Sequence, residues 1–195
     1  LCIVYMCYNF EVSFGTGIAA YTLGYFLFQR NLTETETQIV IAFLIFSSMQ
    51  FVDAILWFSE MKKDLLNYIV TSVIIPIFLS AQVIYNIYFI CNFQKLHHLA
   101  LLALYSFYLF YRFNGYSKPL CNNYFSSPVW GDNELKLWEL FLFAILILYP
   151  HWNMIAFFSV VILLIKHFIN GAMGSWWCFI SALIGIYAYF NFGLK

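Results

Sequence analysis

Charged residues are scarce in this chain. Only 9% of its 195 residues are Asp, Glu, Lys or Arg, whereas about a quarter of the residues are charged in ordinary soluble domains. The nine basic residues balance the nine acidic ones, so no net charge draws the chain to nucleic acid or to an anionic surface. Apolar residues make up 64% of the chain and aromatic residues 23%. This composition predicts an integral membrane protein whose main partner is the lipid bilayer, with no nucleic-acid partner.

Sequence motifs of the common enzyme classes are also missing. The five cysteines form no Cys-x-x-Cys pair, so metal clusters and dithiol redox chemistry are not expected. The chain has no phosphate-binding glycine loop, no Gly-x-Ser-x-Gly elbow and no Gly-x-Gly-x-x-Gly fingerprint. A retinal Schiff base requires a lysine, and the last apolar run, 175–192, contains none. We therefore expect no cofactor and no metal, and the sequence favours a non-enzymatic role without excluding an enzyme.

Long apolar runs dominate what is present. Seven runs approach the roughly twenty residues that a helix needs to cross a bilayer, and short connections join most of them. Neighbouring runs should pack antiparallel, so we predict an all-α, seven-span transmembrane helix bundle that forms one domain over residues 1–195. The predicted spans are 7–28, 38–59, 66–90, 96–112, 135–149, 152–170 and 175–192.

Two stretches depart from this simple layout. The fifth run is short and is broken at Pro150, so a re-entrant hairpin made of runs five and six is the alternative to two full spans. The long connection 113–134 contains Gly, Pro, Asn and Ser, and it is predicted to be an exposed loop. Within the third run, Pro76 should distort the helix and free the carbonyl of Ser72.

The distribution of Lys and Arg predicts an orientation. An odd number of spans puts the two termini on opposite sides, with six basic residues on the N-terminal side and three on the other. Because basic residues concentrate in cytoplasmic loops, we expect a cytoplasmic N-terminus and a C-terminus across the membrane. The two groups are Lys62, Lys63, Arg112, Lys118, Lys136 and Lys166 on the N-terminal side, and Arg30, Lys95 and Lys195 on the other.

A stripe of polar side chains runs along the second predicted span. Its members are Gln50, Asp53, Trp57 and Glu60, which recur three, four and three residues apart and therefore share one helical face. Burying an ionisable side chain in a bilayer costs roughly 3 kcal/mol, so it needs a partner, a water-filled cavity or a function. We predict a polar ligand-binding pocket in the N-terminal-side half of the bundle, with an interfacial location, in contact with headgroups and water, as the alternative for Glu60 and His167 and for Glu139 at the same level. The pocket residues are Glu11, Gln50, Asp53, Trp57, Glu60, His167, Trp176 and Trp177.

A second polar set lies on the third span, toward the other side of the membrane. It comprises Gln82, Tyr85 and Asn86. Gln82 and Asn86 share a helical face, which suits an interhelical hydrogen bond as well as a ligand. A polar route would cross the membrane if both sets lined one path.

Three short motifs resemble those of small, uncharacterised multi-spanning membrane proteins of giant DNA viruses. They are Cys7-Tyr8-Asn9-Phe10-Glu11-Val12-Ser13, Gln50-Phe51-Val52-Asp53-Ala54-Ile55-Leu56-Trp57 and Gly174-Ser175-Trp176-Trp177-Cys178. One departure is that Asp53 stands where the group has Glu. The resemblance supplies no reaction, but it implies that Glu11, Gln50, Asp53, Trp57 and the Trp177-Cys178 step belong together.

Three functions are compatible with these apolar runs and the polar residues within them. The first is a transporter or channel-like protein in which Glu11 and Asp53 bind an ion, a proton or a small cationic ligand. The second is a non-catalytic membrane scaffold, such as a viral envelope component or a subunit of a homo-oligomer or larger membrane complex. The third is an intramembrane metal-dependent hydrolase, which would need several histidines around one metal. The four histidines disfavour it, because they lie at both membrane faces and no two of them have ligand spacing within a span: His97, His98, His151 and His167. The first function predicts that Asp53→Asn abolishes any ion response while the fold stays intact.

Overall fold

The apolar runs form helices in the computed structural model, which describes residues 9–93, 95–121, 126–133, 135–168 and 173–193. The described residues form seven helical rods, and these lie within a few residues of the seven predicted runs. The mainly helical class is therefore confirmed. The rods are α1 (Phe10–Phe28), α2 (Glu34–Ser47) with α3 (Met49–Phe58), α4 (Leu65–Ile69) with η1 (Val70–Ile74), α5 (Ile75–Ile84) and η2 (Tyr85–Ile90), α6 (Leu96–Arg112), α7 (Leu137–Leu148), α8 (Trp152–Phe168) and α9 (Met173–Asn191).

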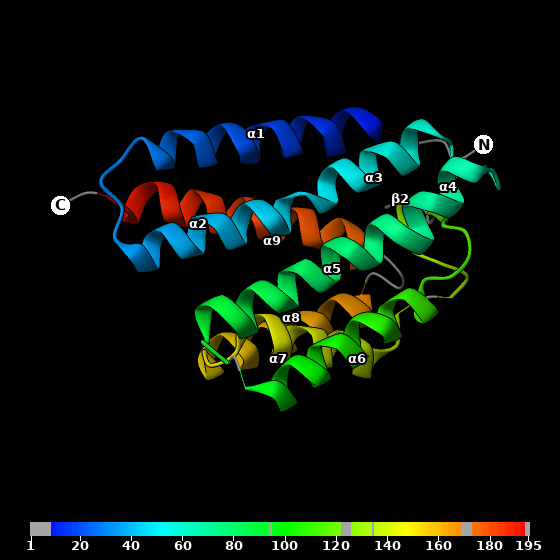
Figure 1. The fold of residues 1–195 in the computed structure, drawn as a ribbon. Helices are drawn as coiled ribbons and strands as arrows, with labels where there is room; N and C mark the ends of the chain where they lie inside the picture. Colours follow the sequence, from blue (N-terminus) through cyan, green and yellow to red (C-terminus); the bar gives the residue numbers. More distant parts are fainter. Residues whose placement is uncertain (1–8, 94, 122–125, 134, 169–172, 194–195) are drawn as a thin grey trace.

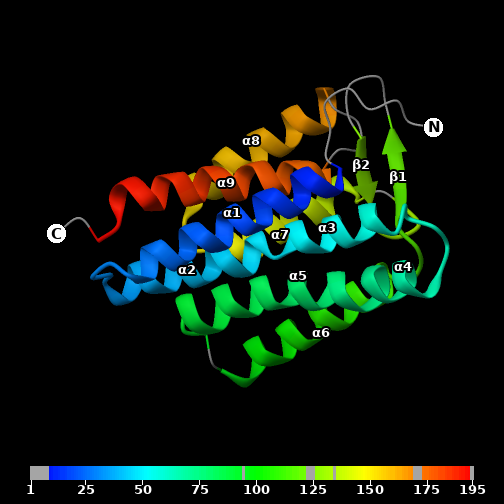
Figure 2. The same ribbon diagram turned by 90° about the horizontal axis from the view of Figure 1, so that it is seen from above.

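Consecutive rods run antiparallel in one bundle (Figure 1). The first helix, α1, packs against α2, α3 and α9, while α5 packs against α6 and α7 against α8. A short β hairpin lies beside the start of α4 (Figure 2), and we call this end of the bundle the hairpin end. The end that holds the α1–α2 connection is called the distal end. The start of α1 and the end of α9 lie at opposite ends of the bundle.

Polar side chains fix where several rods begin. The side chain of Asn9 accepts a hydrogen bond from the first turn of α1, and Asp64 does the same for α4. Thr33 and Glu36 form a capping box at the start of α2, in which each side chain accepts the other residue's backbone N–H. These contacts satisfy amide groups that the first helical turn leaves without a partner.

The α4–η2 rod is irregular on both sides of α5. The π-helical segments η1 and η2 flank it, and Pro76 lies at the start of α5. Proline cannot donate a backbone hydrogen bond, so the regular α-helical ladder is interrupted there. The predicted distortion is therefore present as a change of helix type just before the proline.

The prediction of an exposed loop over residues 113–134 is wrong. Two strands, β1 (Lys118–Cys121) and β2 (Ser126–Val129), pair antiparallel with Lys118 opposite Val129. The segment also folds over the hairpin end, where hydrogen bonds to the α4–η2 rod hold it. Its buried members are Phe113, Ser117, Pro128, Val129, Trp130 and Gly131 among the described residues.

Two continuous helices among the described residues are long and apolar enough to cross a membrane. They are Glu34–Phe58, with 25 residues, and Leu65–Ile90, with 26 residues. At 1.5 Å per residue each spans about 38 Å, which exceeds the roughly 30 Å hydrocarbon core of a bilayer.

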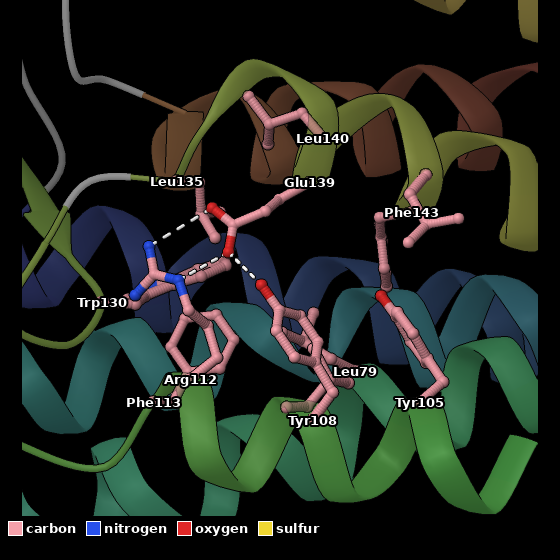
Figure 3. Close-up of a pocket in the computed structure, with 12 residues that line it drawn as sticks. Leu79, Tyr105, Tyr108, Arg112, Phe113, Trp130, Leu135, Glu139, Leu140 and Phe143 are labelled. Atoms are coloured by element: carbon pink, nitrogen blue, oxygen red, sulfur yellow. Dashed lines mark hydrogen bonds and ion pairs between the residues drawn. The ribbon is translucent and has the colours of Figure 1, made fainter.

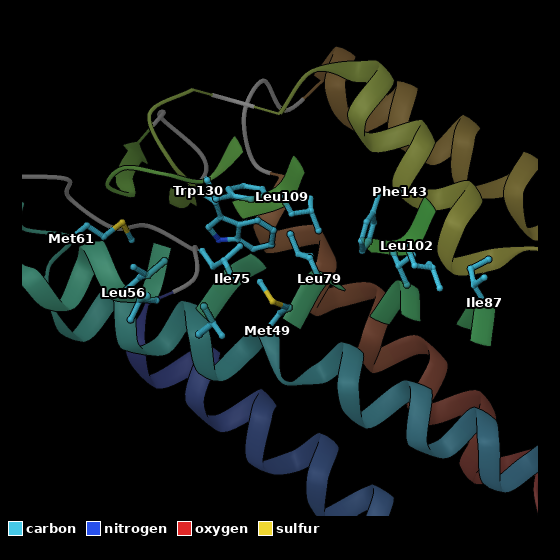
Figure 4. Close-up of a cluster of buried hydrophobic side chains, with 14 residues drawn as sticks. Met49, Leu56, Met61, Ile75, Leu79, Ile87, Leu102, Leu109, Trp130 and Phe143 are labelled. Atoms are coloured by element: carbon cyan, nitrogen blue, oxygen red, sulfur yellow. The ribbon is translucent and has the colours of Figure 1, made fainter. Parts of the chain in front are cut away.

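A buried apolar cluster runs along the bundle between α3, α5, α6 and α7 (Figure 4). It extends from Leu56 and Met61 at the hairpin end to Ile87 at the distal end. Trp130 enters this cluster from the segment after β2 and is 5% exposed. The hairpin segment is thus packed into the core of the bundle.

Gly185→Ala is expected to lower the melting temperature of the protein. A Cβ at this position of α9 would lie 2.8 Å from Phe43 Cζ and 2.9 Å from Leu23 Cδ2, which is too close for a packed interface. Gly15→Ala is the matched control, because nothing lies within 4 Å of its added Cβ. Alanine also favours a helix over glycine by about 1 kcal/mol. Thermal unfolding in detergent should give a lower Tm for Gly185→Ala only. An increase in both variants would contradict the close contact.

Candidate functional site

Asp53 lies in the interior of the bundle, as its position within the second predicted span suggests. It is 1% exposed, and its Oδ1 accepts a hydrogen bond from Trp130 Nε1 at 2.9 Å. The carboxylate comes from the middle of α3 and the indole from the residue after β2. An N–H group donated to a buried carboxylate offsets part of the free energy lost when the carboxylate leaves water.

Gln50 lies on the same buried face of α3, one turn before Asp53. Its Nε2 donates a hydrogen bond to Ser181 Oγ on α9. Trp57, one turn beyond Asp53, is half-buried and packs against the apolar cluster. The part of the predicted stripe from Gln50 to Trp57 therefore faces the interior.

Glu11 and Glu60 are not grouped with Asp53, and this part of the predicted pocket is wrong. Glu11 is exposed in the first turn of α1. Glu60 and Met61 have φ angles of 52° and 48°, so the helix ends at Phe58 and Glu60 leaves the predicted face. The side chain of Glu60 is exposed and forms an ion pair with Lys62 at 2.9 Å.

The remaining residues of the predicted pocket lie in α8 and α9, but their side chains are outside the described part of the structure. They are His167, Trp176 and Trp177. The place of these three side chains relative to Asp53 stays a prediction.

A second buried acidic group, Glu139, forms an ion pair with Arg112. Arg112 Nε lies 2.6 Å from Glu139 Oε1, and their side chains are 13% and 6% exposed. Tyr108, one turn before Arg112 on α6, donates its hydroxyl to the same oxygen at 2.6 Å. The other carboxylate oxygen accepts the backbone N–H of Lys136 at the start of α7. The carboxylate thus joins the end of α6 to the start of α7 by accepting hydrogen bonds from three groups, the Arg112 guanidinium, the Tyr108 hydroxyl and the Lys136 backbone N–H.

A cavity of about 40 Å³ lies beside this ion pair (Figure 3). One buried water needs about 10 to 15 Å³, so the cavity has the volume of a few waters and is too small for larger organic ligands. Trp130 lines the cavity with one side of its indole and reaches Asp53 through its ring nitrogen. Apolar side chains and Tyr105 complete the wall. The lining residues are Leu79, Tyr105, Tyr108, Leu109, Arg112, Phe113, Trp130, Leu135, Glu139, Leu140, Leu142 and Phe143.

A buried polar network fixes the segment that carries Trp130. Asn67 is fully buried, and its side chain donates to the carbonyls of Lys62 and Ser117, both at 2.9 Å. Its Oδ1 accepts the backbone N–H of Ser117 and the hydroxyl of Thr71. Thr71 and Ser72 belong to η1, and their hydroxyl oxygens accept the backbone N–H groups of Ser117 and Gly115. This network holds the hairpin against the α4–η2 rod.

Two residues of the second predicted polar set contact neighbouring side chains or backbone, and the third, Gln82, is a buried amide without a hydrogen-bond partner among the described residues. Asn86 donates to the carbonyls of Leu146 and Tyr149 at 2.9 and 3.0 Å, which ties η2 to the end of α7. Tyr85 is half-buried in a tilted ring contact with Phe89. Gln82 is 6% exposed, and neither its Nε2 nor its Oε1 has a partner among the described residues.

The described histidines do not gather into a cluster. His97 and His98 contact each other at the start of α6, with ring centroids 4.0 Å apart. His151 is exposed after the Tyr149-Pro150 bond. Across the described residues, no three His, Cys, Asp or Glu side chains come close enough to hold a metal ion. The hydrolase hypothesis thus receives no support from this part of the structure.

Sequence reasoning missed Arg112 and Trp130 as site residues, and it gave Glu139 an interfacial location, whereas Glu139 is buried. A signal for the ion pair is present, because an Arg ends one apolar run and a Glu begins the next, where neighbouring helices meet. Tyr108 lies four residues before Arg112, on the same helical face. Trp130 has a weaker signal: it ends the apolar stretch from Pro128 within an otherwise polar segment.

Comparisons of the chain with protein-family models, with curated proteins and with solved structures give no match. The arrangement of residues in this structure is therefore the basis for any functional assignment.

Proposed function

We propose that this protein is a multi-pass integral membrane protein whose seven rods all cross the bilayer. The two longest apolar helices support this arrangement, because the other rods lie alongside them. The α7–α8 turn also reaches the distal end, where Asn86 and Cys91 both donate to the carbonyl of Tyr149. This contact favours two full crossings by α7 and α8 over a re-entrant hairpin.

The outer surface of the bundle supports the same proposal. On α6, large apolar side chains recur every three or four residues and are 63 to 77% exposed. In water such a stripe would be an aggregation hazard, whereas in a bilayer it contacts lipid tails. The stripe consists of Leu101, Leu104, Phe107 and Tyr111. The excess of Lys and Arg near the hairpin end supports an orientation in which that end, with the start of α1, lies on the cytoplasmic side.

We further propose that the bundle conducts protons, with Glu139 as the residue that binds them. The observation that carries this proposal is the Arg112–Glu139 pair beside a small cavity inside an apolar bundle. Ionisable residues within membrane helices are costly, and they are characteristic of proton and ion pathways. The small volume favours protons and water over the organic cations that the sequence also permits.

The expected step is an exchange of partners at Glu139. A proton entering the cavity binds a carboxylate oxygen, and the hydrogen bond from Arg112 Nε to that oxygen breaks. Arg112 keeps the contacts of Nη2, which donates to the carbonyl of Asn133 at 3.2 Å and to Glu139 Oε2 at 3.4 Å. Release of the proton toward the other end restores the ion pair. Asp53 has a supporting role in this scheme, because its oxygen holds the Trp130 indole that lines the cavity.

Proton flux into liposomes that contain the purified protein tests the proposal. An imposed voltage should drive pH-dependent flux in the wild type, and Glu139→Gln should reduce it about a hundredfold, because a positioned proton acceptor has been removed. Asp53→Asn is the comparison variant, and we expect it to reduce flux less than Glu139→Gln does. Wild-type flux in Glu139→Gln would reject the role of Glu139. Loss of flux only in Asp53→Asn would mean that the proton binds at Asp53, in the stripe that the sequence predicts.

A membrane scaffold is the second candidate function. One observation favours it: Glu139 and Asp53, the two buried carboxylates of the described structure, already have partners from this chain. A scaffold of this kind would be a viral envelope component or a subunit of a membrane complex, and its exposed aromatic surface would contact other proteins. The absence of flux in both the wild type and the variants, together with a copurifying protein, would support this role.

A further inference from the structure

Gln82 is a buried amide with unmet hydrogen-bonding capacity. It is 6% exposed on α5, and both polar atoms of its side chain lack a partner among the described residues. A buried polar group left without a hydrogen bond destabilises the folded state, and such groups are rare in folded proteins unless water satisfies them. Gln82 has two such atoms on one side chain. A dry environment at this position would therefore be strongly unfavourable.

The position of Gln82 connects two parts of the polar interior. It lies three residues after Leu79, which lines the cavity, and four residues before Asn86, which donates to α7. Residues at this spacing share one face of a helix. Both α5 and η2 pack against α7, so this face lies along the α7 interface. Gln82 is thus placed between the cavity and the distal end.

We propose that Gln82 binds ordered water inside the bundle and that this water continues the Arg112–Glu139 cavity toward Asn86. The inference rests on the proposed proton conduction and names the group through which the proton travels beyond Glu139. The Oε1 of Gln82 accepts a hydrogen bond from a water O–H, and its Nε2 donates to a water oxygen. The amide neither gains nor loses a proton. A proton from Glu139 joins the first water, and another proton leaves the last water toward the distal end.

Gln82→Met tests this role, because methionine keeps the length of the side chain and removes both polar atoms. Ser80→Ala is the matched control: its hydroxyl is also buried without a partner among the described residues, but it lies on the other side of α5. We expect proton flux in liposomes to fall to the level of empty liposomes in Gln82→Met and to stay at the wild-type level in Ser80→Ala. Wild-type flux together with a higher Tm in Gln82→Met would overturn the proposal, because it would mean that a dry amide had been removed.

Radiolytic footprinting separates this inference from the proposed function, because it modifies side chains that lie next to bound internal water. We expect modification of Leu79 or Phe143 in the wild type and its loss in Gln82→Met. Modification without any wild-type flux would support the water site and reject proton conduction. Flux without modification in the wild type would support conduction and overturn the water site.

Discussion

Arg112→Met is expected to destabilise the protein by about 3 to 5 kcal/mol, because it leaves the Glu139 carboxylate buried without its cationic partner. Glu139 keeps hydrogen bonds from Tyr108 and from the Lys136 backbone, but neither donor carries a charge. The free energy of unfolding, measured by denaturant titration in detergent, gives the size of the effect.

The double variant Arg112→Met with Glu139→Met is the control for this prediction. Replacing both members of a buried ion pair by apolar residues of similar volume is often close to neutral. We therefore expect the double variant to be more stable than Arg112→Met alone. If the single variant lost less stability than the double variant, the pair would be solvated and the interior site would be contradicted.

Trp130→Ala is expected to have a similarly large effect on stability. Trp130 fills part of the apolar cluster, contributes a wall of the cavity and donates to Asp53. Truncating a buried Trp to Ala typically costs about 3 to 5 kcal/mol, through lost burial and the cavity that remains. The loss should appear as a lower midpoint in denaturant unfolding.

Trp130→Phe divides this effect into its two parts. Phenylalanine keeps most of the buried area and removes the N–H donor, so about 1.5 to 3 kcal/mol should remain, as for a hydrogen bond to a charged group. In an Asp53→Leu background the difference between Trp and Phe at position 130 should become small, because the acceptor has been removed. An equal difference in both backgrounds would contradict the Asp53–Trp130 hydrogen bond.

Local sequence patterns predicted the helical rods well. The run 96–112 coincides with α6, because a long apolar stretch between polar residues has few alternatives to a helix. The capping box of Thr33 and Glu36 is likewise a property of neighbouring residues. By contrast, the hairpin was missed because its stability comes from contacts such as Asn67 with Ser117, which are fifty residues apart.

The candidate site was predictable only in part, for the same reason. Helix alternation placed Gln50 and Asp53 inside the bundle, and the structure confirms this placement. This local pattern could not identify Trp130 as the partner of Asp53, because the two residues are 77 positions apart in the sequence. It also extended the α3 stripe to Glu60, whereas the helix ends at Phe58 and Glu60 itself has a positive φ.

Infrared difference spectroscopy across a pH step shows whether Glu139 binds the transported proton. We expect the C=O stretch of a protonated carboxyl group to appear on acidification of the wild-type protein in liposomes. This band should vanish in Glu139→Gln and persist in Asp53→Asn. A band that persists in Glu139→Gln, or a wild-type protein without any such band, would mean that Glu139 is not the residue that binds the proton.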